Sequence, residues 1–228
     1  MELLIAEDVL LLLMDDERGR MAAASHARPL LGGALLVELA LDGGVEVEEK
    51  RGFWHSAKVH ARQLRSPVRP DPLLAEALQV VAEKPRTAQD LVNRLGKGVR
   101  DILQDRLADR GLLERRERKV LGLFPSTTWP AADLAHERQV RERLQGVLVQ
   151  GLTPDPRTAG VVALLQAVDQ AHRVVDRRGL RAGEVKHRAK AIAEGDWAAK
   201  AVRDAVAAAQ SAVAAAVAAS AAAGASGG

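Results

Sequence analysis

The sequence predicts a mainly α-helical protein, a compact helical domain with a protruding β-hairpin and a winged-helix-like segment. Hydrophobic residues make up 47% of the 228 residues and are mainly Leu, Val and Ala, while Phe and Trp number five together and Tyr is absent. Strand-rich proteins of this size use more aromatic and β-branched residues. There is no Cys, which excludes disulfide scaffolds and cysteine-ligated metal sites.

The first elements follow from helix-start signals and hydrophobic patterning. Glu7 and Asp8 precede an apolar run, which predicts a helix over 7–14. A nearly all-apolar segment at 29–41 begins with Pro and is followed by Asp-Gly-Gly, so it predicts a central helix. Residues 45–48 alternate like a short strand.

The middle of the chain predicts shorter helices and then a hairpin. Asp71 and Thr87 stand where helix caps are expected, and apolar residues over 99–113 follow a helical period. Residues 114–124 predict a hairpin whose tip is at 116–119. The remaining helices are expected at 133–150, 156–178 and 184–194.

These elements predict one helical, lipid-binding-like domain over 1–206. An Ala-rich tail follows at 207–228, where the sequence offers little area for burial. We expect packing to end near Val206 and disorder from Ala221 onward.

Charge is segregated along the chain although the net charge is only +3. Residues 1–49 carry eleven acids and three bases, residues 50–69 carry six bases and no acid, and residues 94–119 carry nine bases and five acids. Local clusters of one sign attract partners of the opposite sign. The two basic segments therefore predict an anionic partner: a phosphate head group, a membrane surface or a nucleic acid.

Enzyme motifs are absent from the sequence. It contains no phosphate loop, dinucleotide fingerprint, nucleophile elbow or zinc-protease helix. Asp169, His172 and Asp176 would share a helix face, but no second element converges on them, so we expect a charged stripe and no metal site. We therefore expect a protein that is not an enzyme and has no cofactor.

Residue usage and hydropathy suggest source and location. Arg outnumbers Lys 25 to 8 and Ala and Gly are abundant, as in GC-rich bacterial coding sequences. The Leu-rich apolar run at 9–14 is far shorter than the roughly 20 residues that span a bilayer, and no leader pattern opens the chain. We expect a bacterial protein of the cytoplasm.

Lys97 and Arg100 are the strongest candidates for anion binding. They lie three residues apart at the expected start of the 99–113 helix, and Gly96 and Gly98 let a ligand approach the backbone. Helix N-termini bearing basic side chains bind phosphate groups.

A second reading of the same region is a DNA-binding regulator, because 84–124 has the outline of a winged helix. In such modules the second helix enters the major groove. Here Asp101, Asp105 and Asp109 would line the outer face of that helix and oppose the DNA phosphates. Nucleic acid is therefore not the expected partner.

The order of five segments resembles the Golgi phosphoprotein 3 family, and the resemblance extends to about Val217. The segments are DDERG at 15–19 after the first helix, GGALLVELAL at 32–41, DPLLAEAL at 71–78, VRDIL with RGLL between 99 and 113, and FPSTTWP at 124–130. The family has a mainly helical fold with a protruding hairpin. Its eukaryotic members are peripheral proteins that bind phosphatidylinositol 4-phosphate and retain Golgi glycosyltransferases.

The resemblance also implies site residues. By register, Lys97 and Arg100 match the two basic residues of the family's head-group pocket, whereas Ala23 and Gly32 stand where its Trp and Arg would be. Arg28 lies close enough in sequence to supply a third base.

We therefore expect a peripheral membrane module that binds anionic phospholipid head groups, phosphatidylinositol 4-phosphate-like by resemblance, and acts as an adaptor for cytosolic tails of membrane proteins. Lys97, Arg100 and Arg28 would hold the head group. The expected membrane-facing residues are Phe53, Trp54, Arg115, Arg116, Arg118 and Lys119.

Overall fold

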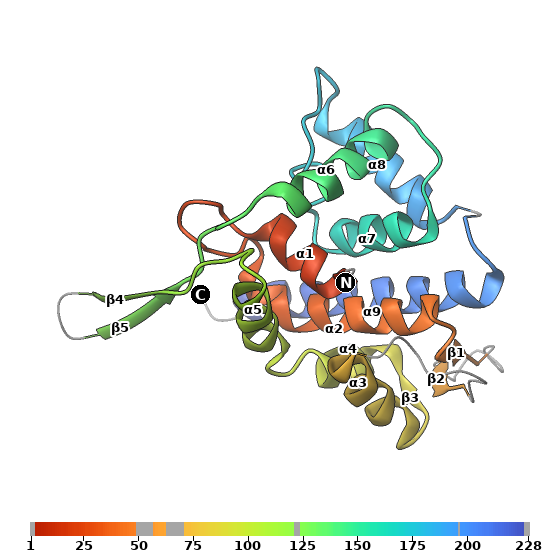
Figure 1. The fold of residues 1–228 in the computed structure, drawn as a ribbon. Helices are drawn as coiled ribbons and strands as arrows, with labels where there is room; N and C mark the ends of the chain where they lie inside the picture. The colour runs from red at the N-terminus through yellow and green to blue at the C-terminus, as the bar shows by residue number, and fades with distance from the viewer. Residues whose placement is uncertain (1–2, 49–56, 63–70, 121–123, 196, 226–228) are drawn as a thin grey trace.

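The computed structural model is mainly helical, as predicted (Figure 1). It describes residues 3–48, 57–62, 71–120, 124–195 and 197–225.

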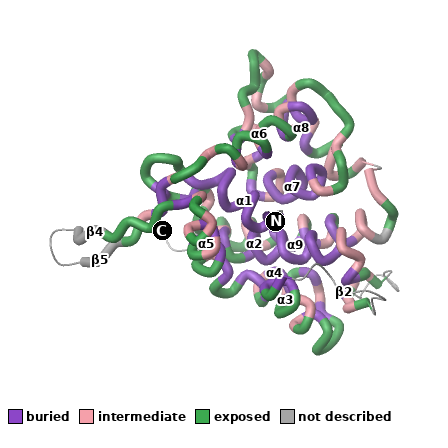
Figure 2. The backbone as a smooth tube through the Cα atoms, in the orientation of Figure 1, coloured by how far each residue is buried: buried purple, intermediate pink, exposed green. Residues whose placement is uncertain are grey.

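Helix α2 (Ala27–Leu41) forms the centre of the core. Apart from Arg28 and Leu41 all its residues are buried, and it packs against α1 (Ile5–Leu13), α4 (Ala88–Leu95), α7 (Pro156–Ala167) and α9 (Lys200–Ala225). Figure 2 shows the buried residues concentrated along these helices. The all-apolar segment is central because a helix without a polar face must be covered on every side.

The other helices lie on two sides of α2. Helices α6 (Ala135–Leu148) and α8 (Ala182–Ala193) lie with α7 on one side, above α2 in Figure 1. Helices α3 (Pro72–Ala82) and α5 (Val99–Asp109) lie with α4 on the other. Asp71 caps α3 and Thr87 caps α4, so both expected caps are confirmed.

A small antiparallel sheet lies at one end of α2. It contains β1 (Val45–Val47), β2 (Lys58–Ala61) and β3 (Arg86–Thr87) in that order. The strand expected near residue 45 is confirmed. In a winged helix, the strand at this position would pair with the hairpin that follows the helices. Here β3 pairs with β2 instead.

The hairpin consists of β4 (Arg116–Val120) and β5 (Phe124–Thr128) and projects from the helices (Figure 1). Arg116 pairs with Thr128 and Val120 pairs with Phe124, so the expected tip at 116–119 was wrong. The bases lie along the first strand, and the return strand continues through Pro125. Proline is accommodated because each strand of a two-stranded sheet has a free edge.

The expected helix over 156–178 was too long. Helix α7 ends at Ala167, and Asp169 adopts a positive φ of 55°. Ala171 and Val174 are buried although they lie in the connecting segment, so their apolar pattern imitated a continuing helix.

Helix α9 packs farther than Val206. Ala209 and Val213 are buried, and the helix extends to Ala225. The segment 202–223 is long and apolar enough, by length and composition, to cross a membrane. The sequence analysis did not single it out, because its polar residues interrupt the apolar runs. Only 28% of its most apolar stretch is buried, and this burial lies between Ala205 and Val213, where α9 packs along α2 and Val213 lies close to Gly33. We interpret this part of α9 as a core segment.

Candidate anion-binding site at the junction of α4 and α5

The candidate site is built on the tight turn between α4 and α5. Gly98 precedes α5 with a φ of +74°, a conformation that glycine adopts without strain. The Lys97 N–H donates to the Arg94 carbonyl at 3.2 Å, and the Lys97 side chain is exposed. Arg100 lies half-buried in the first turn of α5, where its buried Nε has no hydrogen-bond partner in the described structure.

Arg28 joins this junction from the start of α2. Its Nε donates to the Asn93 carbonyl at 2.8 Å, and its own carbonyl lies against Gly96. The fold therefore gathers Arg28, Lys97 and Arg100 from three segments. Among the described residues, none of the three bases forms an ion pair.

Gly32 explains how closely α2 approaches α4, and Ala23 lies before α2. A Cβ added at Gly32 would lie well inside van der Waals contact with the Val92 carbonyl and the Gly96 nitrogen. An arginine at position 32 is therefore incompatible with this packing of α2 on α4. Ala23 is half-buried before the short helix η1 (Ala24–His26), with a φ of 53°.

Ile102 is a surface residue that the sequence reasoning missed. Its helical spacing suggested a core position, yet it is 43% exposed in the first turn of α5. Asp101 and Asp105 are also exposed on this helix, and Asp105 is paired with Arg115 at 3.7 Å. Ile102 thus adds an exposed apolar side chain to α5, the helix that also carries Arg100.

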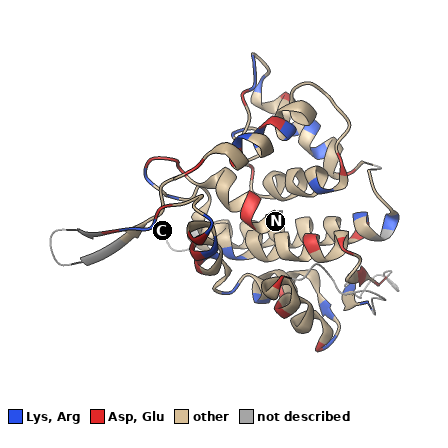
Figure 3. Cartoon of the chain, viewed as in Figure 1, with Lys and Arg blue, Asp and Glu red and all other residues tan. Residues whose placement is uncertain are grey.

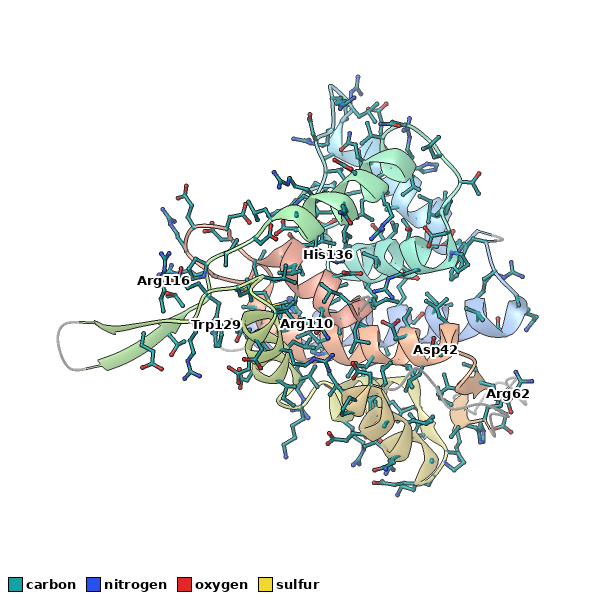
Figure 4. All side chains as sticks on the ribbon, viewed as in Figure 1. Asp42, Arg62, Arg110, Arg116, Trp129 and His136 are labelled. Atoms are coloured by element: carbon teal, nitrogen blue, oxygen red, sulfur yellow. The ribbon has the colours of Figure 1, made fainter. Side chains whose placement is uncertain are left out.

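The base of the hairpin is less cationic than its composition suggests. Arg116 pairs with Glu114 at 2.6 Å, and this hydrogen bond lowers the pKa of the Glu114 carboxyl. Arg115 pairs with Glu117 at 3.0 Å and lies 5.6 Å from the ring centre of the buried Trp129. Arg116 and Trp129 are labelled at the base of the hairpin in Figure 4. Both expected membrane contacts are therefore engaged with neighbouring groups.

Other expected contacts cannot be placed. Phe53 and Trp54 lie outside the described residues, as do the side chains of Arg118 and Lys119.

A separate cluster of charges lies inside the protein. The buried carboxylates of this cluster are those of Glu7, Asp8, Glu38 and Asp71. Arg106 donates to Glu7 at 3.2 Å and to both oxygens of Asp71 at 3.0 and 2.6 Å, and Arg110 pairs with Glu7 at 3.4 Å. These bonds join α1 to α3 and α5.

The second half of the cluster faces α6 and α7. Arg157 donates to Asp8 at 2.8 Å and to Glu38 at 2.9 Å, and the ring of His136 lies 2.7 Å from Asp8. Figure 4 marks His136 and Arg110 near α1. Because every carboxylate is paired, this is an ionic framework for the fold. The first-turn acids of α1 were its only sign in the sequence.

Asp169, His172 and Asp176, which the sequence analysis considered as a metal site, do not form a group of metal ligands among the described residues. His172 lies 3.7 Å from Asp169, which also pairs with Lys186, and the described residues contain no group of three metal-ligating side chains. Burial lowers the pKa of His172, with smaller opposing and reinforcing effects from nearby charges.

The segments 15–19 and 124–130, both of which resemble the Golgi phosphoprotein 3 family, pack against each other. Gly19, at a φ of 59°, lies against the Trp129 backbone, and the Ala131 N–H donates to the Asp16 carbonyl at 2.9 Å. The loop after α1 and the segment after β5 thus form one unit.

The fold and the site define a mainly helical protein with a projecting hairpin and a basic site at a helix junction. The family model of Golgi phosphoprotein 3 (GPP34) matches residues 5–209, and the chain belongs to this family. No curated protein matches the chain.

Proposed function

We propose that the protein is a peripheral membrane module that binds anionic phospholipid head groups and acts as an adaptor for cytosolic tails of membrane proteins. The observation that carries the lipid proposal is the convergence of Arg28, Lys97 and Arg100 without a carboxylate partner in the described structure. Ile102, exposed on the same helix as Arg100, offers an apolar contact to a bilayer. Family membership supports the adaptor role.

The lipid proposal concerns head-group charge and not one particular lipid. The positions of the family's Trp and Arg hold Ala23 and Gly32, so ring packing and one charged contact are lost. The remaining bases suit a phosphate group, because arginine and lysine form charge-assisted hydrogen bonds with it.

The test is co-sedimentation with vesicles of phosphatidylcholine containing phosphatidylserine or phosphatidylinositol 4-phosphate. A base near an anionic surface contributes about 1 kcal/mol, so Lys97→Ala with Arg100→Ala should lose about 2 kcal/mol, or about thirtyfold in affinity. The matched control is Arg181→Ala with Lys190→Ala, at the N-cap of α8 and on α8 itself, which removes equal charge from the opposite side of α2.

Unchanged sedimentation of the Lys97/Arg100 double variant would remove this site from the proposal. Duplex DNA serves as the parallel ligand across a salt series. If the variant loses DNA binding and keeps vesicle binding, the winged-helix reading of residues 84–124 becomes the better one.

A further inference from the structure

An arginine-rich cleft lies far from the α4–α5 junction. It has a volume of about 470 Å³ and opens between α6 and the segment that joins α7 to α8. Its charged lining residues are Arg138, Arg141, Glu142, Arg173, Asp176 and Arg178. Figure 3 shows basic residues gathered around α6 and α8.

The cleft has an excess of positive charge. Four arginines face two carboxylates, which leaves a net charge of +2. Arg141 is paired with Glu137 at 2.6 Å, whereas Arg138, Arg173 and Arg178 are exposed and have no ion pair within the described residues. Three guanidinium groups are therefore available to an incoming anion.

Both walls of the cleft are held in place without a ligand. Arg141 donates to the Val174 carbonyl at 2.9 Å, and the Gln145 side-chain amide donates to the Asp176 carbonyl at 2.6 Å. Two side chains of α6 thus fix the connecting segment. A site that is formed in advance loses less entropy when a ligand binds.

Arg178 occupies an unusual conformation at the end of this segment. Its φ is 45°, a region that a long side chain rarely adopts, and Gly179 follows with a φ of 90°. The Arg178 N–H donates to the Asp176 side chain at 3.1 Å, which stabilises the turn. Backbone strain of this kind concentrates at functional sites.

The position of the cleft separates it from the proposed lipid site. Helix α6 and the connecting segment lie on one side of α2, and α4 and α5 lie on the other (Figure 1). The cleft and the junction therefore belong to different groups of helices, and a variant of one leaves the residues of the other in place.

We propose that this cleft binds a soluble, multiply charged phosphorylated small molecule. Arginine forks match phosphate oxygens in a bidentate geometry, and the volume lies within the range of small-molecule sites. A phosphate group could equally come from a lipid, so vesicles form a second arm of the test.

The probe is inorganic pyrophosphate, titrated into the full chain in a calorimeter at low salt. Arg138→Gln with Arg173→Gln should weaken binding at least tenfold. The matched control, Arg143→Gln with Arg177→Gln, removes the same charge from α6 and the same connecting segment at exposed positions outside the cleft, and it should change affinity less than threefold. Arg138→Lys with Arg173→Lys should fall between them, because the charge stays and the fork is lost.

Absence of pyrophosphate binding by the unmodified protein would overturn the proposal, as would equal losses in the cleft and control variants. Loss of vesicle binding in the cleft variant, with no pyrophosphate binding by the unmodified protein, would make the cleft a membrane contact instead. The Lys97/Arg100 variant should still bind pyrophosphate. This expectation keeps the two proposals separately testable.

Discussion

Asp71 performs two tasks in the buried ionic framework, and its removal should destabilise the protein strongly. It is 2% exposed and caps α3 by accepting from the backbone N–H groups of Leu73 and Leu74 at 2.9 and 3.4 Å. It also accepts two hydrogen bonds from Arg106, which remains bound to Glu7 at 3.2 Å. Asp71→Ala removes the cap and one partner of the buried pair.

The size of the loss follows from these contacts. A lost N-cap costs about 1 kcal/mol, and breaking a buried ion pair costs about 3–5 kcal/mol. Arg106 is 20% exposed and keeps Glu7, so the pair should cost less than that range, and the two effects share one side chain and do not add. We expect about 3 kcal/mol, which lowers the Tm by about 6–12 °C at this chain length.

The pH dependence gives a second signature. Burial raises the pKa of Asp71, but hydrogen bonding and charge from Arg106 and the two N–H groups outweigh it, so the net pKa lies below the ordinary 3.8. A folded pKa below the unfolded value means that the contribution is present above about pH 4 and is lost as pH falls through the folded pKa. Asp71→Asn keeps the cap and loses this contribution. Its deficit relative to the unmodified protein should therefore shrink between pH 7 and pH 3.5.

Urea denaturation followed by circular dichroism measures both effects. Glu76→Ala is the control, because Glu76 is exposed on the same helix, and it should change stability by less than about 0.5 kcal/mol. An Asp71→Ala loss below about 1 kcal/mol at pH 7 would refute the assigned role of the framework. A deficit of Asp71→Asn that stays constant with pH would refute the lowered pKa.

Three further outcomes are expected. Gly32→Ala should destabilise the protein by about 1–3 kcal/mol in urea, because its Cβ meets the Val92 carbonyl; unchanged or higher stability would contradict the close packing of α2 on α4. His172→Gln should reduce the fall in stability between pH 7 and pH 5. Burial is the largest cause that lowers the folded pKa of His172, so the stability contributed by the neutral ring is present above the unfolded pKa and is lost as pH falls through the folded pKa. If the variant loses as much stability as the unmodified protein between the two pH values, the lowered pKa of His172 is contradicted. Arg115→Glu with Arg116→Glu should weaken sedimentation with anionic vesicles at least tenfold, and an equal loss with neutral vesicles would point to misfolding instead of lost attraction.

Helix content and the central position of α2 could be predicted because they depend on local sequence. An apolar segment between Pro29 and Asp42 has no polar face to turn toward water, so burial follows from composition. The caps at Asp71 and Thr87 were predictable for a similar reason, since they satisfy N–H groups within three residues. Lys97 and Arg100 could be singled out because three-residue spacing places them at one helix start.

Tertiary structure alone decided how these elements meet. The register of β4 and β5 places the hairpin bases along a strand, because pairing from Arg116 to Thr128 depends on backbone geometry that the turn signals did not specify. Ile102 had core-like spacing, yet α5 turns it outward.

The composition of both proposed sites also depends on long-range packing. Arg28 approaches Lys97 only because Gly32 and Gly96 let α2 and α4 pack closely. The cleft arginines on α6 and the connecting segment lie more than thirty residues apart, and α7 ends at Ala167, earlier than its sequence pattern suggested. Local sequence therefore determined the helices and the charges they carry. Long-range packing determined which charges share a surface, because it depends on side-chain volumes brought together from distant parts of the chain.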